Sequence, residues 1–419
     1  MHRIRADARA HYGVCGPCKA GLMIERAVDF ERLRSMRCGS CMYEWRATAE
    51  WLESFSNGDE SCPECGTGCQ VEERPNFWAA RDDPSYDDSK ILDMYWYHSS
   101  THANWPDRTF DPNAGLTDVS KQRFQEIGSA GQGLECWASR QLTKALHVGT
   151  YEAAIENMLR RMADQGSAGD QFYLYRVRLA RNAVIEPGVH ADPGNWVGDV
   201  QLAELCAPGV DVYRYVNTHE DPSSVSLAVT LHAVEAVQRI PIPLAVDLIH
   251  PWVIAAVAHL LYAASLPTPQ PKTKLEILRQ RMPSELSKEA RRMEQEIADT
   301  LPLALRDRLH VNFDAASLSS NPGTFPSTLI GLAQLVKDPQ TTLNLLDAES
   351  WQPCYLDRSS ADRCVNRGRA IEQRNRDRQW KMHAIRLPLS NRACSDNVES
   401  YGTNSIRPRA RFRGAHARR

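Results

Sequence analysis

At residues 91–101 the chain reads ILDMYWYHSST, and this stretch decides how we interpret the rest of the sequence. Its apolar and aromatic part, residues 91–97, has the composition and length of a buried strand. Polar residues follow immediately, beginning with His98 and Ser99. Folds place binding and catalytic groups preferentially in the polar segments beside such elements. We therefore expect a strand that ends in functional side chains.

Length and composition predict a cytoplasmic protein with more than one domain. A chain of 419 residues, 42% of them hydrophobic, is long enough for two or three domains with separate cores. Its formal net charge of -2 favours no particular electrostatic partner. The polar, basic N-terminus does not resemble a signal peptide, and the most apolar run, residues 251–265, is shorter than a bilayer-spanning helix. We therefore expect no membrane association, and cysteines that are thiols or metal ligands.

Seven of the twelve cysteines fall between positions 15 and 69, and their spacing predicts zinc binding. Each CxxC pair can hold one metal ion through a tight turn, and two such pairs complete a tetrahedral site. The predicted ligands are Cys15, Cys18, Cys38, Cys41, Cys62, Cys65 and Cys69. We assign residues 1–73 to a cysteine-rich zinc-binding module.

Residues 37–66, RCGSCMYEWRATAEWLESFSNGDESCPECG, resemble a treble-clef or zinc-ribbon module. The resemblance implies one site made of Cys38, Cys41, Cys62 and Cys65, which leaves Cys15 and Cys18 to join Cys69 or His11. The alternative groups Cys15, Cys18, Cys38 and Cys41, with Cys62, Cys65 and Cys69 around a second ion. Arginines between positions 26 and 46 favour nucleic-acid binding, whereas acidic residues between positions 50 and 73 oppose it. A structural or protein-docking role stays open.

Beyond this module the sequence predicts an α+β fold in several parts. Residues 74–90 are acidic and contain proline, which is typical of a linker. Residues 91–266 mix short strands, at 146–150, 172–179 and 211–222, with helices, one capped by Thr150 and one over 225–240. Residues 267–365 have the amphipathic pattern of a helical region. Residues 366–419 are arginine-rich, and we expect disorder there.

Three pieces of the central region resemble the ADP-ribosyltransferase fold in their order and character. They are YHSS at 97–100, LHVGTYEAAIENM at 146–158 followed by FYLYRVRL, and YRYVNTHEDPSSVSL at 213–227. The nearest branch contains the poly-ADP-ribose polymerases and the rifamycin ADP-ribosyltransferases. The resemblance implies that residues 91–266 take NAD as a substrate and transfer ADP-ribose to a macromolecular acceptor, either protein or nucleic acid. The zinc module would then help to recognise the target.

The resemblance also assigns roles to individual residues. Glu220 is the predicted catalytic carboxylate, with Asp221 as a neighbour able to replace it, because cleavage at the ribose builds positive charge on the sugar. His98 and Ser99 are predicted to hold NAD. Tyr151 is the aromatic residue nearest to the position of the ring that stacks on nicotinamide, and the alternatives for that ring are His147 and Tyr175.

Each predicted site residue also has a purely structural interpretation, and the chain has alternative functions. A histidine at a strand end is often only hydrogen-bonded, an aromatic residue at a helix start such as Tyr151 ordinarily packs in the core or on the surface, and Glu220 is suited to capping a turn. The first alternative function is a non-enzymatic zinc-ribbon adaptor that binds nucleic acid or protein. The second is an NAD glycohydrolase, which would use the same site with water as the acceptor.

Overall fold

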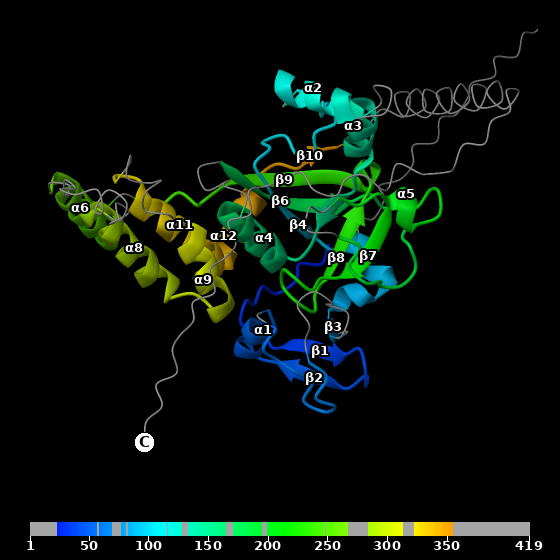
Figure 1. Cartoon of the computed structure of the whole chain (residues 1–419), viewed down its shortest axis with the longest axis horizontal. Coiled ribbons are helices and arrows are strands. Elements are labelled where there is room, and N and C mark those ends of the chain that lie inside the picture. The colour runs from blue at the N-terminus through cyan, green and yellow to red at the C-terminus, as the bar shows by residue number, and fades with distance from the viewer. Residues whose placement is uncertain are drawn as a thin grey trace, which may run out of the picture. The chain divides into compact units, whose positions relative to one another are not determined.

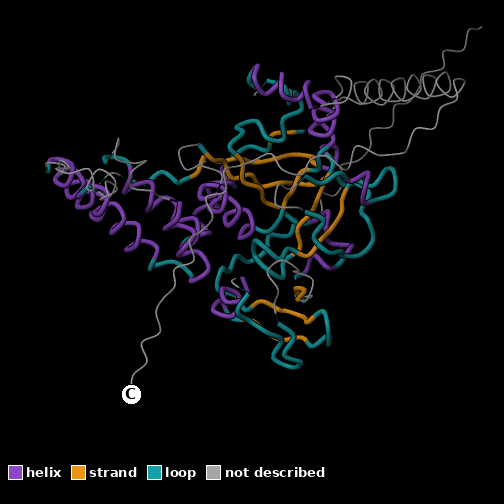
Figure 2. Tube along the Cα trace, in the orientation of Figure 1, coloured by secondary structure: helices purple, strands orange, loops and turns teal. Residues whose placement is uncertain are grey.

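The computed structural model describes residues 23–56, 58–68, 77–80, 83–114, 116–127, 133–164, 171–194, 199–247, 249–266, 284–312 and 322–354. They all belong to one compact unit, Met1–Tyr355, with a mixed α+β fold (Figures 1 and 2). The predictions for Cys15, Cys18, Cys69 and the arginine-rich tail lie outside the described residues. None of the helices described here combines the length and hydropathy needed to cross a bilayer.

The N-terminal part is a small three-stranded antiparallel sheet with one helix. Its strands are β1 (Arg34–Cys38), β2 (Glu44–Ala47) and β3 (Phe77–Ala79) in the order β2-β1-β3, and its helix is α1 (Ala49–Ser56). Side chains alternate along β1, so Met36 and Cys38 face a core that includes Phe77. Residues 74–90, predicted as a linker, therefore contribute a strand to this sheet, because Phe77 fills its core. We call the described residues between 32 and 80 the ribbon.

Two further antiparallel sheets form the centre of the chain. One has the order β10-β9-β6-β4, from β4 (Trp96–Ser100), β6 (Phe172–Leu179), β9 (Val234–Ile242) and β10 (Gln352–Pro353). The other has the order β5-β8-β7, from β5 (Leu146–Val148), β7 (Val212–Val216) and β8 (Val225–Val229). A β-bridge between Tyr97 and Gly149 joins the two sheets. Their facing sides share one apolar cluster, to which Trp96, Tyr175 and Leu227 belong.

Two predicted elements differ from the structure. The strand begins at Trp96 and not at Ile91, because Asp88–Asp93 forms a 3-10 helix whose first turn is capped by the Asp87 carboxylate. The helix expected over 225–240 is instead β8 and β9, separated by a 3-10 turn at Leu231–Ala233. All five residues of β8 are buried, so the apolar run does not alternate as a half-exposed strand would.

Other predicted elements are confirmed. The strand at 172–179 is β6. Helix α4 (Tyr151–Asp164) follows β5, and the Thr150 hydroxyl accepts a hydrogen bond of 2.9 Å from the Ala153 N–H, as an N-cap does. Four more elements surround the sheets: the 3-10 helix η2 (Pro84–Tyr86) and helices α2 (Asp118–Ile127), α3 (Gly133–Thr143) and α5 (Leu202–Leu205).

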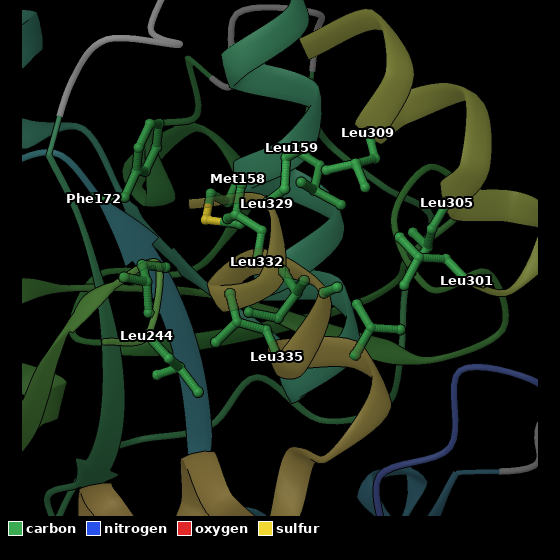
Figure 3. Close-up of a cluster of buried hydrophobic side chains, with 14 of the residues drawn as sticks. Met158, Leu159, Phe172, Leu244, Leu301, Leu305, Leu309, Leu329, Leu332 and Leu335 are labelled. Atoms are coloured by element: carbon green, nitrogen blue, oxygen red, sulfur yellow. The ribbon is translucent and has the colours of Figure 1, made fainter. Parts of the chain in front are cut away.

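The C-terminal helices share a core with the central sheet. They are α6 (Pro251–Ser265), α8 (Glu285–Ala298), α9 (Leu303–Asn312), α11 (Phe325–Lys337) and α12 (Pro339–Ala348). Figure 3 shows how Met158 and Leu159 of α4 meet Leu309 of α9 and Leu332 of α11. Helix α11 comes very close to the chain after β9, since a Cβ added at Gly331 would lie 2.2 Å from the Leu244 carbonyl oxygen. Burial of these leucines fixes α4, and with it the residues that α4 presents to the sites below.

Candidate functional site

Four cysteines of the ribbon lie together in an arrangement compatible with a metal ion such as zinc. The ligand atoms of Cys38, Cys41, Cys62 and Cys65 all lie within 4.8 Å of one another. The Sγ atoms of Cys38 and Cys65 are 3.8 Å apart, and those of Cys41 and Cys62 are 3.6 Å apart. Zn–S bonds of about 2.3 Å in a tetrahedron place the sulfurs about 3.8 Å from each other. The thiols therefore fit the first of the two predicted pairings.

The two CxxC turns have matching backbone geometry. The Cys38 N–H donates to the Tyr43 carbonyl and the Cys62 N–H donates to the Thr67 carbonyl, and both donor–acceptor distances are 2.9 Å. The residue after the second cysteine of each turn is left-handed, with φ 63° at Met42 and φ 69° at Gly66. Hydrogen bonds from the hydroxyl and N–H of Thr67 lower the pKa of Cys65, whereas burial and the neighbouring thiols raise the pKa of Cys41. The thiolate, which is the form that binds metal, is therefore favoured at Cys65 and not at Cys41.

His98 lies on the side of β4 that faces the second sheet. Its ring stacks on Trp105 with 4.1 Å between centroids, and its Nδ1 is 2.8 Å from the His147 carbonyl oxygen. Burial lowers the pKa of His98 to about 3, so the imidazole is neutral at pH 7. Because a carbonyl can only accept, Nδ1 carries the proton and Nε2 is left as a hydrogen-bond acceptor.

The other two residues predicted to contact NAD are buried. Ser99 is 2% exposed, and its Oγ has no hydrogen-bond partner in the part of the chain that the structure describes. Tyr151 is also 2% exposed, its hydroxyl donates to the Leu335 carbonyl, and its ring packs edge-on against Tyr97. Of the alternatives for the stacking ring, Tyr175 is fully buried and bonds the His102 carbonyl, whereas His147 is half-buried.

Glu220 lies in the loop between β7 and β8, against helix α4. Its Oε1 accepts hydrogen bonds from Arg160 Nε at 2.9 Å and Asn157 Nδ2 at 3.2 Å. Its side chain is 15% exposed, so solvent reaches the carboxylate. The backbone N–H of Glu220 donates to Asn217 Oδ1, which fixes the start of the loop.

A line of contacts runs from His98 toward Glu220, although no hydrogen bond or ion pair joins these two described residues directly. The His98 ring bonds the backbone of His147, and the His147 Nδ1 is 2.9 Å from the Tyr215 hydroxyl. Burial raises the pKa of Tyr215 well above its ordinary value, and the charges of Asp192 and Glu220 raise it further.

A second constellation, centred on Asp221, was not predicted from the sequence. The Asp221 side chain is 1% exposed and its Oδ1 lies 3.0 Å from both Arg32 Nη2 and Arg34 Nη2. Its Oδ2 accepts a hydrogen bond of 2.6 Å from the Thr150 hydroxyl. The Asp221 N–H donates to Glu156 Oε2 at 3.0 Å. Asp221 thus joins the ribbon, the start of α4 and the β7–β8 loop at one buried point.

The carboxylates of α4 complete this charge cluster. Burial raises the pKa of Glu152 to about 7, and the nearby charge of Asp221 acts in the same direction. Burial also raises the pKa of Glu156, which pairs with Arg308 of α9 at 3.5 Å. Perturbed carboxylates near paired cations are common at functional sites and in structural ion networks. Every member of this cluster is engaged by a neighbour, so we interpret it as a connection between parts of the fold.

The backbone at the centre of the cluster is strained. Asp221 has φ 49° and Ser223 has φ 75°, values that residues with a side chain rarely adopt. Each costs about 1–3 kcal/mol and persists only where the surrounding contacts enforce it. A sequence signal for the cluster does exist: Glu152 and Glu156 are one turn apart on a helix whose neighbouring positions are alanine and isoleucine. Acidic residues on such an apolar face require buried partners.

The chain was compared with protein-family models, curated proteins and solved structures. No family model, curated protein or solved structure matches it.

Proposed function

We propose that this protein transfers ADP-ribose from NAD to a macromolecular acceptor, with Glu220 as the catalytic carboxylate. The observation that supports the proposal is the run of contacts from His98 through His147 to the Tyr215 hydroxyl, on the strand that leads into the loop of Glu220. It connects the strand-end histidine of the first sheet with β7 of the second.

The chemistry suits the protonation states of these residues. When the bond between nicotinamide and ribose breaks, its electron pair leaves with nicotinamide and positive charge develops on the sugar. The Glu220 carboxylate stabilises that charge and orients the acceptor, whose nucleophilic atom bonds to the ribose carbon and gives its proton to solvent. His98 Nε2, an acceptor, holds a ribose hydroxyl and fixes the pose of NAD.

The direct test follows label from adenine-labelled NAD into macromolecules. The zinc-loaded 419-residue chain is incubated with labelled NAD and separate pools of protein and nucleic acid, and wild type is compared with Glu220→Gln. Glu235→Gln is the matched control, because Glu235 is also a partly buried carboxylate paired with an arginine, 20% exposed and 2.6 Å from Arg178. We expect incorporation with wild type and the control, and at least a hundredfold less with Glu220→Gln. Equal incorporation with Glu220→Gln would refute the role of Glu220.

A second candidate, a zinc-ribbon adaptor, is favoured by apolar residues on the ribbon surface. Met42 is 51% exposed, Tyr43 42% and Trp78 38%. Exposed aromatic and methionine side chains are typical of binding surfaces. If labelled NAD is never cleaved and Trp78→Ala abolishes binding to single-stranded nucleic acid or to a protein partner, the adaptor function replaces the transferase. Nicotinamide release without a labelled acceptor would instead identify an NAD glycohydrolase.

A further inference from the structure

One strand connects the metal centre to the charge cluster. β1 begins at Arg34 and ends at Cys38, one of the four thiols. Residues two apart in a strand point to the same side, so Arg34 and Cys38 lie on one face of β1, about 13 Å apart. The middle residue of that face, Met36, is 2% exposed in the ribbon core. The metal centre and Arg34 are thus joined by one short strand whose middle residue is packed in the core.

Arg34 and Arg32 are the cations that accompany the buried Asp221 carboxylate. Arg34 is 4% exposed and Asp221 is 1% exposed, which leaves almost no water to replace a lost partner. A buried carboxylate without its cation is strongly unfavourable. Arg32 also contacts the loop a second time, through Nη1 and the Ser223 hydroxyl at 3.4 Å. The ribbon therefore stabilises the side of the loop that carries both strained residues.

The loop at residues 217–224 depends on contacts from outside its own backbone. Asp221 and Ser223 have positive φ, and such conformations persist where neighbouring groups enforce them. Arg32 and Arg34 of the ribbon contact the loop, together with Thr150 at the start of α4 and Glu156 within it. These contacts add to hydrogen bonds within the loop, such as the one from the Ser223 N–H to the Asn217 carbonyl. Glu220 immediately precedes Asp221, and Arg160 and Asn157 of α4 hold its carboxylate, so the ribbon contacts act on Glu220 through the backbone of the loop.

We propose that metal binding at the four cysteines controls the conformation of the 217–224 loop through Arg34 and Arg32, which act as positioning residues for Glu220. The statement about Glu220 rests on the proposed function, whereas the coupling between metal and loop does not. Coupling between two sites is reciprocal. Weakening the contact between Arg34 and Asp221 therefore lowers metal affinity, and removing the metal loosens the loop.

Hydrogen exchange of the full chain measures the first half of this coupling. Peptides that cover residues 217–224 are followed by mass spectrometry in zinc-loaded protein, in chelator-treated protein and in Arg34→Gln. We expect exchange in this loop at least tenfold faster after either change. Peptides from α11 report whether the rest of the fold stays intact. Arg37→Gln is the matched control, because Arg37 belongs to the same strand, is nearer to Cys38, and faces the exposed Glu44 at 3.8 Å instead of Asp221.

Metal affinity measures the second half. In competition with a chromophoric chelator, Arg34→Gln is expected to bind zinc at least fivefold more weakly than wild type, and Arg37→Gln to bind like wild type. Arg34→Lys keeps the charge but lacks the planar guanidinium group. Compared with Arg34→Gln, it should therefore recover part of the protection of the 217–224 loop from hydrogen exchange and part of the zinc affinity. Fast exchange in α11 peptides would reveal that Arg34→Gln unfolds the whole chain. In that case the coupling is tested by comparing loop exchange in zinc-loaded wild type with that in chelator-treated wild type and in Arg34→Lys.

The outcomes separate this inference from the proposed function. Unchanged loop exchange after metal removal, or equal effects of Arg34→Gln and Arg37→Gln, overturns the coupling. Coupling observed together with a Glu220→Gln variant that transfers ADP-ribose normally leaves the coupling standing and refutes the proposed catalytic role. Loss of transfer in Glu220→Gln with no loop response to metal refutes the coupling alone.

Discussion

The contact between Arg34 and Asp221 makes the sharpest stability prediction, because its burial is nearly complete. Removing one partner of a buried ion pair costs about 3–5 kcal/mol. Asp221 retains Arg32 at 3.0 Å and the Thr150 hydroxyl at 2.6 Å, so we expect Arg34→Gln to lie at the lower end, about 3 kcal/mol. Asp221→Asn should cost a similar amount, because it leaves two arginines without their carboxylate.

The double variant distinguishes a specific pair from general damage. Arg34→Gln with Asp221→Asn removes both charges together, so its cost should fall short of the sum of the single costs by about 2 kcal/mol. Arg37→Gln, which loses only a 3.8 Å contact with a carboxylate that is 60% exposed, should cost less than about 1 kcal/mol.

Urea unfolding of the zinc-loaded protein measures these costs from the midpoint and slope. The reasoning is refuted if the single costs of Arg34→Gln and Asp221→Asn simply add, or if Arg37→Gln destabilises the protein as much as Arg34→Gln.

Three further predictions follow from other parts of the structure. Metal analysis of protein purified without chelator should find at least one zinc per chain, and Cys62→Ser should remove the ion held by the four described cysteines; less than one zinc per wild-type chain would count against the site. Burial raises the pKa of Glu152 in the folded protein from 4.5 to about 7, so the protonated carboxyl stabilises the fold relative to the unfolded chain. This contribution to the free energy of unfolding, about 3 kcal/mol, is fully present below pH 4.5 and is lost as pH rises through 7. Glu152→Gln, which keeps the acceptor for the Asp29 N–H, should flatten this part of the stability–pH profile, and an unchanged slope between pH 4.5 and 7 would contradict it. Gly331→Ala should destabilise the protein by about 1–3 kcal/mol or more in thermal unfolding, because its methyl group meets a backbone oxygen that cannot rotate away; a melting temperature equal to that of wild type would disprove this contact.

Local sequence signals predicted the elements that depend on local interactions. The CxxC spacing predicted that the two cysteines of each pair share a metal ion, because a tight turn brings them together without help from distant residues, but it left open which two pairs combine. The structure brings Cys38 and Cys41 to Cys62 and Cys65. Thr150 was recognised as a helix cap, and β6 was recognised from its alternation. In each case the deciding partner lies a few residues away or repeats at a fixed period.

Sequence reasoning failed where burial on both faces or distant partners decide the structure. β8 is buried on both faces, and its run of small and branched residues resembled one face of a helix. The charge cluster was missed because Arg32 and Asp221 are 189 positions apart, and no local pattern joins them. Their juxtaposition depends on where the ribbon docks, which requires the tertiary structure.

The most direct test of the central claim is nicotinamide release from NAD by the zinc-loaded 419-residue chain. The account predicts steady release by wild type and by Glu235→Gln, and at least a hundredfold slower release by Glu220→Gln. No nicotinamide from wild type with any protein or nucleic-acid acceptor, or equal release by Glu220→Gln, would contradict it.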